Sequence, residues 1–279
     1  MEYYMTDERI AEYLKALENE ERAAATVEKY RRALLSFAAF LSGAAVTPEM
    51  IRLWKDDLRA RNYVPSTINT YLAALNGFFR FCGWADCRAR FLKIQRRLFR
   101  DSKRELTRAE YERLVAAAEA AGDRGLALLM ETICSTGIRV SEVQYITVEA
   151  AKNGKTEIAL KGKIRTILLP SKLCRKLLKY AARQKTASGA IFRTKSGKAM
   201  SRYQIWSKMK KLCVRAGVDA GKVFPHNLRH LFATAFYRAY KDIVKLADVL
   251  GHSSIETTRI YLVTSAAEHR RQLEQLKLV

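Results

Sequence analysis

The sequence predicts a mainly α-helical protein of the α+β class, in which a helical bundle precedes a mixed domain with a small β-hairpin or sheet. The first observation is the recurrence of apolar residues at spacings of three and four through residues 10–78. The second is a pair of short strand-like runs near the middle of the chain, and the third is a basic stretch between the two regions. The 279 residues are enough for two domains. We expect the bundle over 1–87, a basic linker over 88–104 and the mixed domain over 105–279.

Four helices are expected in the bundle, each with an apolar stripe along one face. The stripe of the second helix alternates steps of three and four and consists of Val27, Tyr30, Leu34, Phe37 and Leu41. The third helix is expected to start at Thr47-Pro48-Glu49, where a capping hydroxyl precedes a proline in the first turn. A fourth helix is expected after Pro65, with Ser66 as its cap.

A strongly basic stretch lies where the helical periodicity of the bundle ends. It holds eight basic residues against one acid, Asp101. The basic residues are Arg88, Arg90, Lys93, Arg96, Arg97, Arg100, Lys103 and Arg104. One interpretation is a solvated loop. We favour a DNA-binding interdomain linker whose cations lie along a phosphate backbone.

The mixed domain opens with Thr107 and Glu110 at the spacing of a capping box, and helix is expected from there to about Cys134. Residues 156–160 and 166–170 have the composition of two strands, with Lys161-Gly162-Lys163 at the turn of the hairpin. The chain is expected to be helical again after Ser171, apart from a short extended piece at 190–192.

The charge of the chain indicates its partner. Lys and Arg number 51 against 28 Asp and Glu, which leaves a formal charge of +23. Such an excess predicts a polyanion such as nucleic acid, whose phosphates release counterions when cations bind. No apolar run approaches the ~20 residues that a membrane span needs, and residues 1–10 lack a signal-peptide core. We therefore expect a cytoplasmic protein without a membrane partner.

The five cysteines are scattered and show no CxxC pair. That spacing predicts neither a disulfide framework nor a zinc site. We expect the thiols to be reduced and to pack as small apolar groups.

A turn with an arginine follows the apolar helix, in the stretch Thr136-Gly137-Ile138-Arg139-Val140-Ser141-Glu142. Gly137 is expected to end that helix. Arg139 is expected to begin the next one, where a helix N-terminus favours anions. The alternative is a surface salt bridge between Arg139 and Glu142.

A second cluster joins two imidazoles, a guanidinium and a phenol. His226 and Arg229 lie three apart and share a helical face. His252 follows a glycine, and the pattern of 253–256 predicts a capping box for a helix that carries Tyr261 about two turns inside it. A phenol has a reference pKa of roughly 10, but surrounding cations and bases can activate it against a phosphodiester. The cluster therefore predicts a protein that cuts DNA through a covalent bond.

These motifs resemble those of the tyrosine recombinases, the family of phage integrases and Xer-type recombinases. The matching stretches are TGIRVSE at 136–142, KGK at 161–163, HNLRH at 226–230 and LGHSSIETTRIY at 250–261. The resemblance covers the mixed domain, which is then the catalytic domain. The N-terminal bundle is similar, more loosely, to the SAM-like core-binding domain of the family.

The resemblance implies a role for each residue. Tyr261 would attack the scissile phosphate, and Arg139 and Arg229 would clamp its non-bridging oxygens. Lys161 would protonate the departing 5′-oxygen, with Lys163 as the alternative general acid, because many relatives read GKG where this chain reads KGK. The supporting roles fall to His226 for proton transfer at the nucleophile, His252 as a donor to a phosphate oxygen and Glu142 as an orienting group. His230 is expected to be structural on helix geometry, because a turn of about 100° per residue separates it from Arg229 and places it near neither His226 nor a shared face.

The resemblance also implies partners. The reaction would need no metal and no cofactor, because guanidinium and imidazole groups handle the phosphate charge. The substrate would be double-stranded DNA with an inverted-repeat core site, bound by a protein that is a monomer in solution and a tetramer on DNA. Residues 266–278 would form a C-terminal helix that docks on a neighbour or on its own subunit. Two alternatives are a type IB topoisomerase and a non-catalytic DNA-binding regulator.

Overall fold

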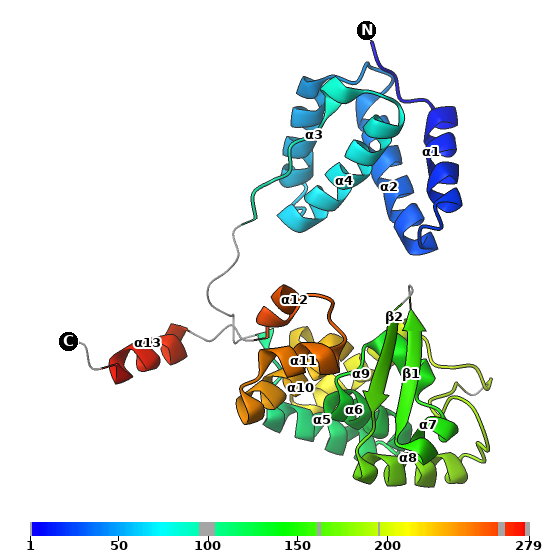
Figure 1. Cartoon of the computed structure of the whole chain (residues 1–279), viewed down its shortest axis with the longest axis vertical. Coiled ribbons are helices and arrows are strands. Elements are labelled where there is room, and N and C mark those ends of the chain that lie inside the picture. The colour runs from blue at the N-terminus through cyan, green and yellow to red at the C-terminus, as the bar shows by residue number, and fades with distance from the viewer. Residues whose placement is uncertain (1, 95–103, 161–162, 195, 262–265, 277–279) are drawn as a thin grey trace. The chain divides into compact units, whose positions relative to one another are not determined.

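The computed structural model describes residues 2–94, 104–160, 163–194, 196–261 and 266–276. The chain divides into two compact units, residues 1–96 and 97–279 (Figure 1). Each unit has its own apolar core. The boundaries expected from the sequence, including a linker over 88–104, stay a prediction, because residues 95–103 lie outside the described part of the chain.

The first unit is a bundle of four helices. They are α1 (Asp7–Asn19), α2 (Ala24–Leu41), α3 (Pro48–Ala60) and α4 (Pro65–Phe81), followed by the 3-10 helix η1 (Ala85–Cys87). Their apolar stripes meet in a core in which Phe37 packs against Trp54 and Phe79. Thr47 caps α3 as expected, because its hydroxyl accepts from Met50 N. The expected cap of α4 is wrong: Val64 holds that position, and the proline at the first turn sets the start.

Two asparagines of α4 hold the chain that leaves the bundle. Asn76 exchanges hydrogen bonds with the backbone of Ala89, at 2.8 and 3.0 Å, and Asn69 does the same with Leu92, at 2.8 and 2.9 Å. Ala89 is buried, whereas Arg88 and Arg90 on either side of it are exposed. The start of the basic stretch is therefore a fixed extended segment with its cations turned to solvent.

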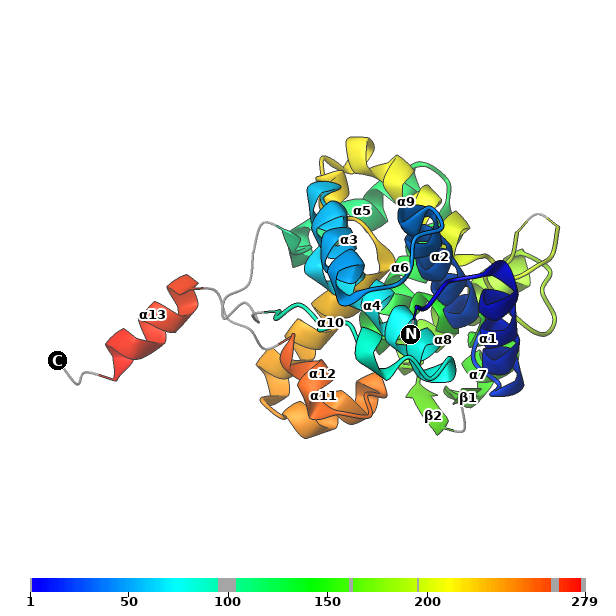
Figure 2. The same ribbon diagram turned by 90° about the horizontal axis from the view of Figure 1, so that it is seen from above.

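The second unit is helical around one hairpin (Figures 1 and 2). Its described elements before the hairpin are α5 (Arg108–Ala120), α6 (Arg124–Thr136), the 3-10 helix η3 (Val140–Tyr145) and α7 (Val148–Asn153). Strands β1 (Lys155–Leu160) and β2 (Lys163–Leu168) pair antiparallel beside α7. The later elements are α8 (Ser171–Arg183), α9 (Arg202–Ala216), the 3-10 helix η4 (Ala220–Lys222), α10 (Pro225–Tyr240), α11 (Ile243–Leu250), α12 (Ile255–Arg259) and α13 (Ala266–Gln275).

Helix α6 is the centre of this unit. Leu129, Met130 and Ile133 are fully buried on it, and the helix packs against α5, α8, α9 and α10. Each buried side chain of this size stabilises the fold by about 1.5–3 kcal/mol. The α+β class predicted from the sequence is confirmed.

Three expected element boundaries are wrong. The helix expected up to Cys134 is two helices, because α5 ends at Ala120 and Asp123 caps a new one. The second strand runs over 163–168 rather than 166–170, since Lys163 pairs with Leu160. The third concerns α12, which ends at Arg259, so Tyr261 lies just beyond it.

The five cysteines are free, and three of them, Cys87, Cys174 and Cys213, are buried. Burial raises the pKa of Cys174 and Cys213, which keeps these thiols protonated at neutral pH. Among the described residues, no helix is both long and apolar enough to cross a bilayer.

Candidate active site

Arg139 is placed by the end of α6. Gly137 closes that helix with φ +64°, as expected, and a Cβ at this position would collide with the ring of Phe232. The chain then turns, and Arg139 stands as the residue that precedes η3. Its side chain, 41% exposed, reaches the carbonyl of Gly251 with Nη2 at 3.1 Å. A side chain that is exposed to this extent can still receive an anion.

Glu142 lies buried between two arginines. Its Oε1 accepts from Arg139 Nη1 at 2.8 Å and its Oε2 accepts from Arg165 Nη1 at 2.5 Å. The salt bridge between Arg139 and Glu142 that the sequence offered as an alternative is present, but its carboxylate is only 1% exposed and so lies below the surface. Because Glu142 is buried and Arg165 nearly so, removing either of these two partners is expected to cost about 3–5 kcal/mol.

The pKa of Glu142 shows how firmly this carboxylate is held. Burial by itself raises the pKa, but the backbone N–H of Arg139 and the guanidinium groups of Arg165 and Arg139 outweigh burial and lower it. Glu142 therefore stays ionised and fixes the direction in which Arg139 points.

Arg165 is a site residue that the sequence reasoning missed. It pairs with Ile158 across the hairpin and shares the buried face of β2 with Ile167. Its Nη2 donates to the carbonyl of Val249 at 2.8 Å, which joins β2 to the end of α11. A two-residue alternation counted back from Ile167 would have placed this arginine on the inner face.

Helix α10 carries His226 and Arg229 as expected, with Pro225 at its first position. Arg229 is 2% exposed and donates to the carbonyls of Gly137 and Leu250, the latter at 2.8 Å. Its Nη2 also lies 2.9 Å from Nε2 of His252. The guanidinium is therefore locked by three contacts to the ends of α6 and α11.

His252 follows Gly251, which ends α11 with φ +62°. A Cβ at Gly251 would collide with the side chain of Arg165, so a glycine lets that arginine pass. Nδ1 of His252 lies 2.9 Å from Oγ1 of Thr258, a fully buried residue of α12. Thr258 is a second residue that the sequence reasoning missed.

Tyr261 is only 3% exposed and packs with Ala233, Leu246 and Leu250 in a small separate core. Its ring stacks on that of His252, with centroids 5.9 Å apart and planes 10° apart, and lies 6.4 Å from the ring of His226. The phenol of Tyr261 acts to raise the pKa of Arg229, against the larger lowering caused by burial. The four expected groups Arg229, His226, His252 and Tyr261 therefore meet at one place.

His230 lies closer to the nucleophile candidate than expected. Its ring centroid is 5.0 Å from that of Tyr261. One helical position after Arg229, it had been expected to face away from the cluster. His230 follows His226 by four residues, about one helical turn, so both rings lie on the face of α10 that the ring of Tyr261 contacts. Ser254, not Ser253, caps α12, and its hydroxyl accepts from Glu256 N.

The lysine candidates are not placed at the site. Lys161 lies outside the described residues, and Lys163 is the first residue of β2, of whose side chain nothing is described. Of the basic stretch, the exposed members that the structure describes are Arg88, Arg90, Lys93 and Arg104. Arg96, Arg97, Arg100 and Lys103 lie outside the described residues.

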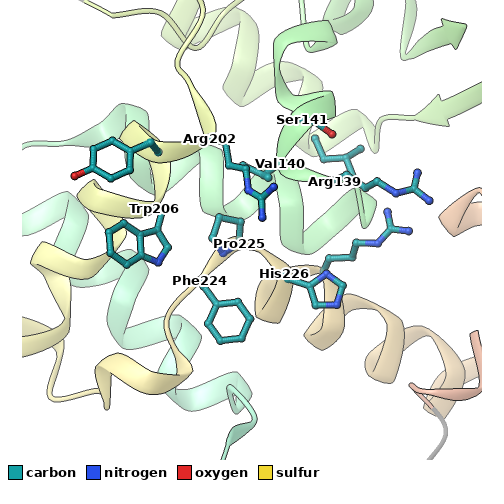
Figure 3. A pocket seen from close by; sticks show the side chains of 11 residues that line it. Arg139, Val140, Ser141, Arg202, Trp206, Phe224, Pro225 and His226 are labelled. Carbon is teal, nitrogen blue, oxygen red and sulfur yellow. The ribbon is translucent and has the colours of Figure 1, made fainter. Parts of the chain in front are cut away.

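A cavity of about 760 Å³ opens beside this cluster. Arg139 and His226 line one side and Trp206 the other (Figure 3). Arg202, at the first position of α9, and Arg229 also line it. The start of α9, with its exposed basic and aromatic side chains, was not predicted as part of the site. The signal in the sequence is Arg202 and Tyr203 directly after a serine that caps the helix.

The cationic surroundings lower the pKa of both histidines. Burial, Arg229 and Arg139 lower that of His226. Burial, then the three guanidinium groups of Arg229, Arg139 and Arg165, lower that of His252 to about 4. Both imidazoles are therefore neutral at pH 7. The pKa of Arg229, lowered to about 10 by burial, leaves it charged.

Acid is expected to destabilise the protein through His252. Because its pKa falls from 6.5 to about 4 on folding, the unfolded chain binds the proton more tightly between these values. The contribution of this difference to the free energy of unfolding is fully present above pH 6.5 and is lost as the pH falls to about 4. The lowered pKa of His226 acts in the same direction. Urea midpoints measured across this range should fall with pH, and less steeply in His252→Gln. An unchanged slope in that variant would contradict the assignment.

In the part of the chain that the structure describes, no three His, Cys, Asp or Glu side chains gather as metal ligands. The charged groups that face the cavity are guanidinium groups, which bind phosphate with a planar fork of donors.

Comparisons with known proteins agree with this arrangement. The profile of the phage integrase family matches residues 104–268, and that of its N-terminal SAM-like domain matches 10–86. Tyrosine recombinase XerA of Pyrococcus furiosus is 29% identical over 99% of this chain and 96% of its own. Tyrosine recombinase XerD of Xanthomonas campestris pv. campestris is 30% identical over 96% of this chain and 90% of its own.

Solved structures share the fold. The XerH site-specific recombinase bound to its difH substrate superposes with a TM-score of 0.70 at 20% identity, over 96% of this chain and 84% of that one. A lambda integrase dimer bound to a core site gives 0.76 at 17% identity, over 93% of this chain and 77% of that one.

The fold and the site together define a tyrosine recombinase, an enzyme that breaks and rejoins DNA strands. Its class is that of the site-specific DNA recombinases, and neither the topoisomerase nor the non-catalytic regulator is favoured. The chain belongs to the phage integrase family.

Proposed function

We propose that the protein cleaves and rejoins DNA by transesterification through a 3′-phosphotyrosyl intermediate, in integration, excision or resolution. The observation that carries this proposal is a cavity lined by Arg139, Arg229 and His226. His252 contacts Arg229 beside it, and the ring of Tyr261 lies against those of His226 and His252. A phosphodiester is the substrate that such a donor set fits, because two guanidinium groups can bind both non-bridging oxygens.

In the first step the phenol oxygen of Tyr261 attacks phosphorus, its proton passes to a base, and the 5′-oxygen leaves with a proton from a lysine. Neutral His226 is suited to take the phenolic proton. The positive charge of Arg229 favours the negative charge that develops on the phenol oxygen, an attraction that also acts to raise the pKa of Arg229. In the second step a 5′-hydroxyl attacks the phosphotyrosine and restores the phenol, so no external energy source is needed.

Arg139 and Arg229 would supply most of the transition-state stabilisation. In phosphoryl transfer the protein acts chiefly by positioning and by charge on the equatorial oxygens. Both guanidinium groups are fixed before substrate arrives, the first by Glu142 and the second by backbone carbonyls. Their orientation therefore requires little reorganisation during the reaction.

The proposed partner is double-stranded DNA with an inverted-repeat core site, recognised in the cytoplasm. The formal charge of +23 supports this, as do the exposed Arg88, Arg90 and Lys93 of the basic stretch. A lambda integrase tetramer bound to a Holliday junction shares the fold. We propose that this chain is a monomer in solution and a tetramer on DNA.

The test of this function is covalent trapping in EDTA on nicked suicide duplexes, drawn from a randomised pool and from the DNA that flanks the gene. We expect SDS-resistant adducts without added metal, and sequencing of the trapped DNA would give the site. Tight, salt-sensitive binding with no adduct on any duplex would point to a DNA-binding protein without this chemistry.

The general acid is testable by changing the leaving group. We expect Lys161→Ala to slow cleavage about 10²–10⁴-fold on ordinary DNA, the range for lost general acid catalysis. A substrate with sulfur in place of the bridging 5′-oxygen should restore the rate, because a thiolate leaves without a proton. Lys163→Ala is the matched control. Rescue by sulfur in that variant, and not in the first, would move the general acid to Lys163.

The C-terminal helix is proposed to dock on a neighbouring subunit. Its Leu273 and Leu276 are exposed, as expected of a segment that packs on a partner. A chain that ends at Ser265 should bind and cleave a half-site but fail to form synaptic complexes in native gels. Leu273→Ala with Leu276→Ala should show the same defect. Normal synapsis by the shortened chain would rule out the docking role.

A further inference from the structure

The surroundings of His252 assign a proton to one ring nitrogen. Nε2 lies 2.9 Å from Nη2 of Arg229, and Nδ1 lies 2.9 Å from Oγ1 of Thr258. The guanidinium has donors only, whereas the threonine hydroxyl can donate or accept. Nε2 must therefore be the acceptor, since a proton on it would face an N–H of Arg229.

It follows that the neutral ring carries its proton on Nδ1 and that the hydroxyl of Thr258 accepts from it. The opposite arrangement, with Thr258 donating to Nδ1, would leave two donors opposed at 2.9 Å between His252 and Arg229. Hydrogen bonding at one ring nitrogen sets the tautomer and hence the chemistry of the other.

Thr258 is held in place for this contact. It is fully buried in α12, a five-residue helix that starts at the cap Ser254. Its carbonyl accepts from the backbone N–H of Tyr261 at 3.0 Å. One residue therefore contacts the histidine through its side chain and the nucleophile through its backbone. Thr257 beside it is exposed.

We propose that Thr258 is a positioning residue that holds His252 with the proton on Nδ1 and Nε2 directed at Arg229 and the phosphate site. In the empty site Nε2 accepts from Arg229. When a phosphodiester occupies the site, the N–H of Arg229 that faced Nε2 turns to a phosphate oxygen, and Nε2, after gaining one proton from solvent, donates to another. Thr258 accepts from Nδ1–H before and after that gain, so the ring need not turn. The catalytic part of this inference rests on the proposed function.

The kinetic test compares three variants in single-turnover adduct formation. Thr258→Val keeps the shape and removes the acceptor, and we expect it to slow the reaction about tenfold, the effect of one hydrogen bond. Thr258→Ser keeps the oxygen and should restore the rate. Thr257→Val is the matched control and should react like the wild type. A normal rate in Thr258→Val would overturn the proposal.

A double-mutant cycle separates positioning from a purely structural role. If Thr258 acts through His252, Thr258→Val should cause no further loss of rate in protein that already carries His252→Ala. A tenfold loss that persists in that background would show that Thr258 acts by another route, and would overturn the proposal.

A measurement that does not need cleavage is the ¹⁵N spectrum of protein labelled in its four histidines. His252→Gln identifies the resonance. We expect the wild type to show Nδ1 protonated and Nε2 unprotonated, and Thr258→Val to show a mixture of tautomers or ring motion. The opposite tautomer in the wild type would contradict the proposal even if adducts form. Absence of adducts together with the expected tautomer would instead count against the proposed function alone.

Discussion

Tyr261→Phe is expected to abolish the covalent protein–DNA adduct completely while DNA affinity stays within about twofold. The variant loses the attacking oxygen, whereas affinity for DNA depends mostly on cations that bind many phosphates. The phenyl ring still fills the space among Ala233, Leu246 and Leu250, so the free energy of unfolding should fall by no more than about 1 kcal/mol.

The measurement is SDS-resistant adduct on a suicide duplex, beside binding at several salt concentrations. Tyr237→Phe is the control, since Tyr237 packs on the same small core and should keep full activity. Adduct that survives in Tyr261→Phe would show that another group attacks. Equal loss in both variants would point to a damaged core rather than to a missing nucleophile.

Arg229→Lys is expected to slow adduct formation about 10²–10³-fold, the loss found for single donors that stabilise a transition-state oxyanion. Lysine keeps the charge but not the planar fork. It cannot at once reach the carbonyls of Gly137 and Leu250, the ring of His252 and a phosphate oxygen. Single-turnover rates at saturating DNA measure the effect apart from binding.

Arg238→Lys is the matched control, because Arg238 is exposed on the same helix. Its rate should be unchanged. Arg229→Lys should also lower the urea midpoint, since two buried carbonyls lose a donor. A normal rate in a folded Arg229→Lys protein would mean that this guanidinium only supports the fold, and that Arg139 alone faces the phosphate.

Much of the fold follows from local patterns. The stripes of α2 and α3 predicted helices because a 3.6-residue period places every third or fourth side chain on one face. Gly137 predicted the end of α6 because its positive φ is open to glycine at no steric cost. The end of α12 was missed because no glycine or proline stops it, so boundaries decided by packing were the weak point.

The reacting groups could be named from the sequence because their residue types and spacings are specific to one chemistry. The three-residue spacing of His226 and Arg229 on a helix, and the resemblance of 250–261 to a motif of the family, needed no knowledge of the tertiary structure. The family comparison confirms the class of enzyme that these groups indicate. The individual catalytic roles of these residues stay predictions.

The tertiary structure decided what surrounds those groups. Only packing could show that Glu142 lies between Arg139 and Arg165, the second of which is 23 residues further along the chain. The same holds for the contact of Thr258 with His252. Burial and neighbouring cations, not residue type, lower the pKa of His252 to about 4. Local sequence determines helices and reactive groups because these depend on nearest neighbours. Orientation, tautomer and charge state depend on groups that are distant along the chain, and only the folded structure brings them together.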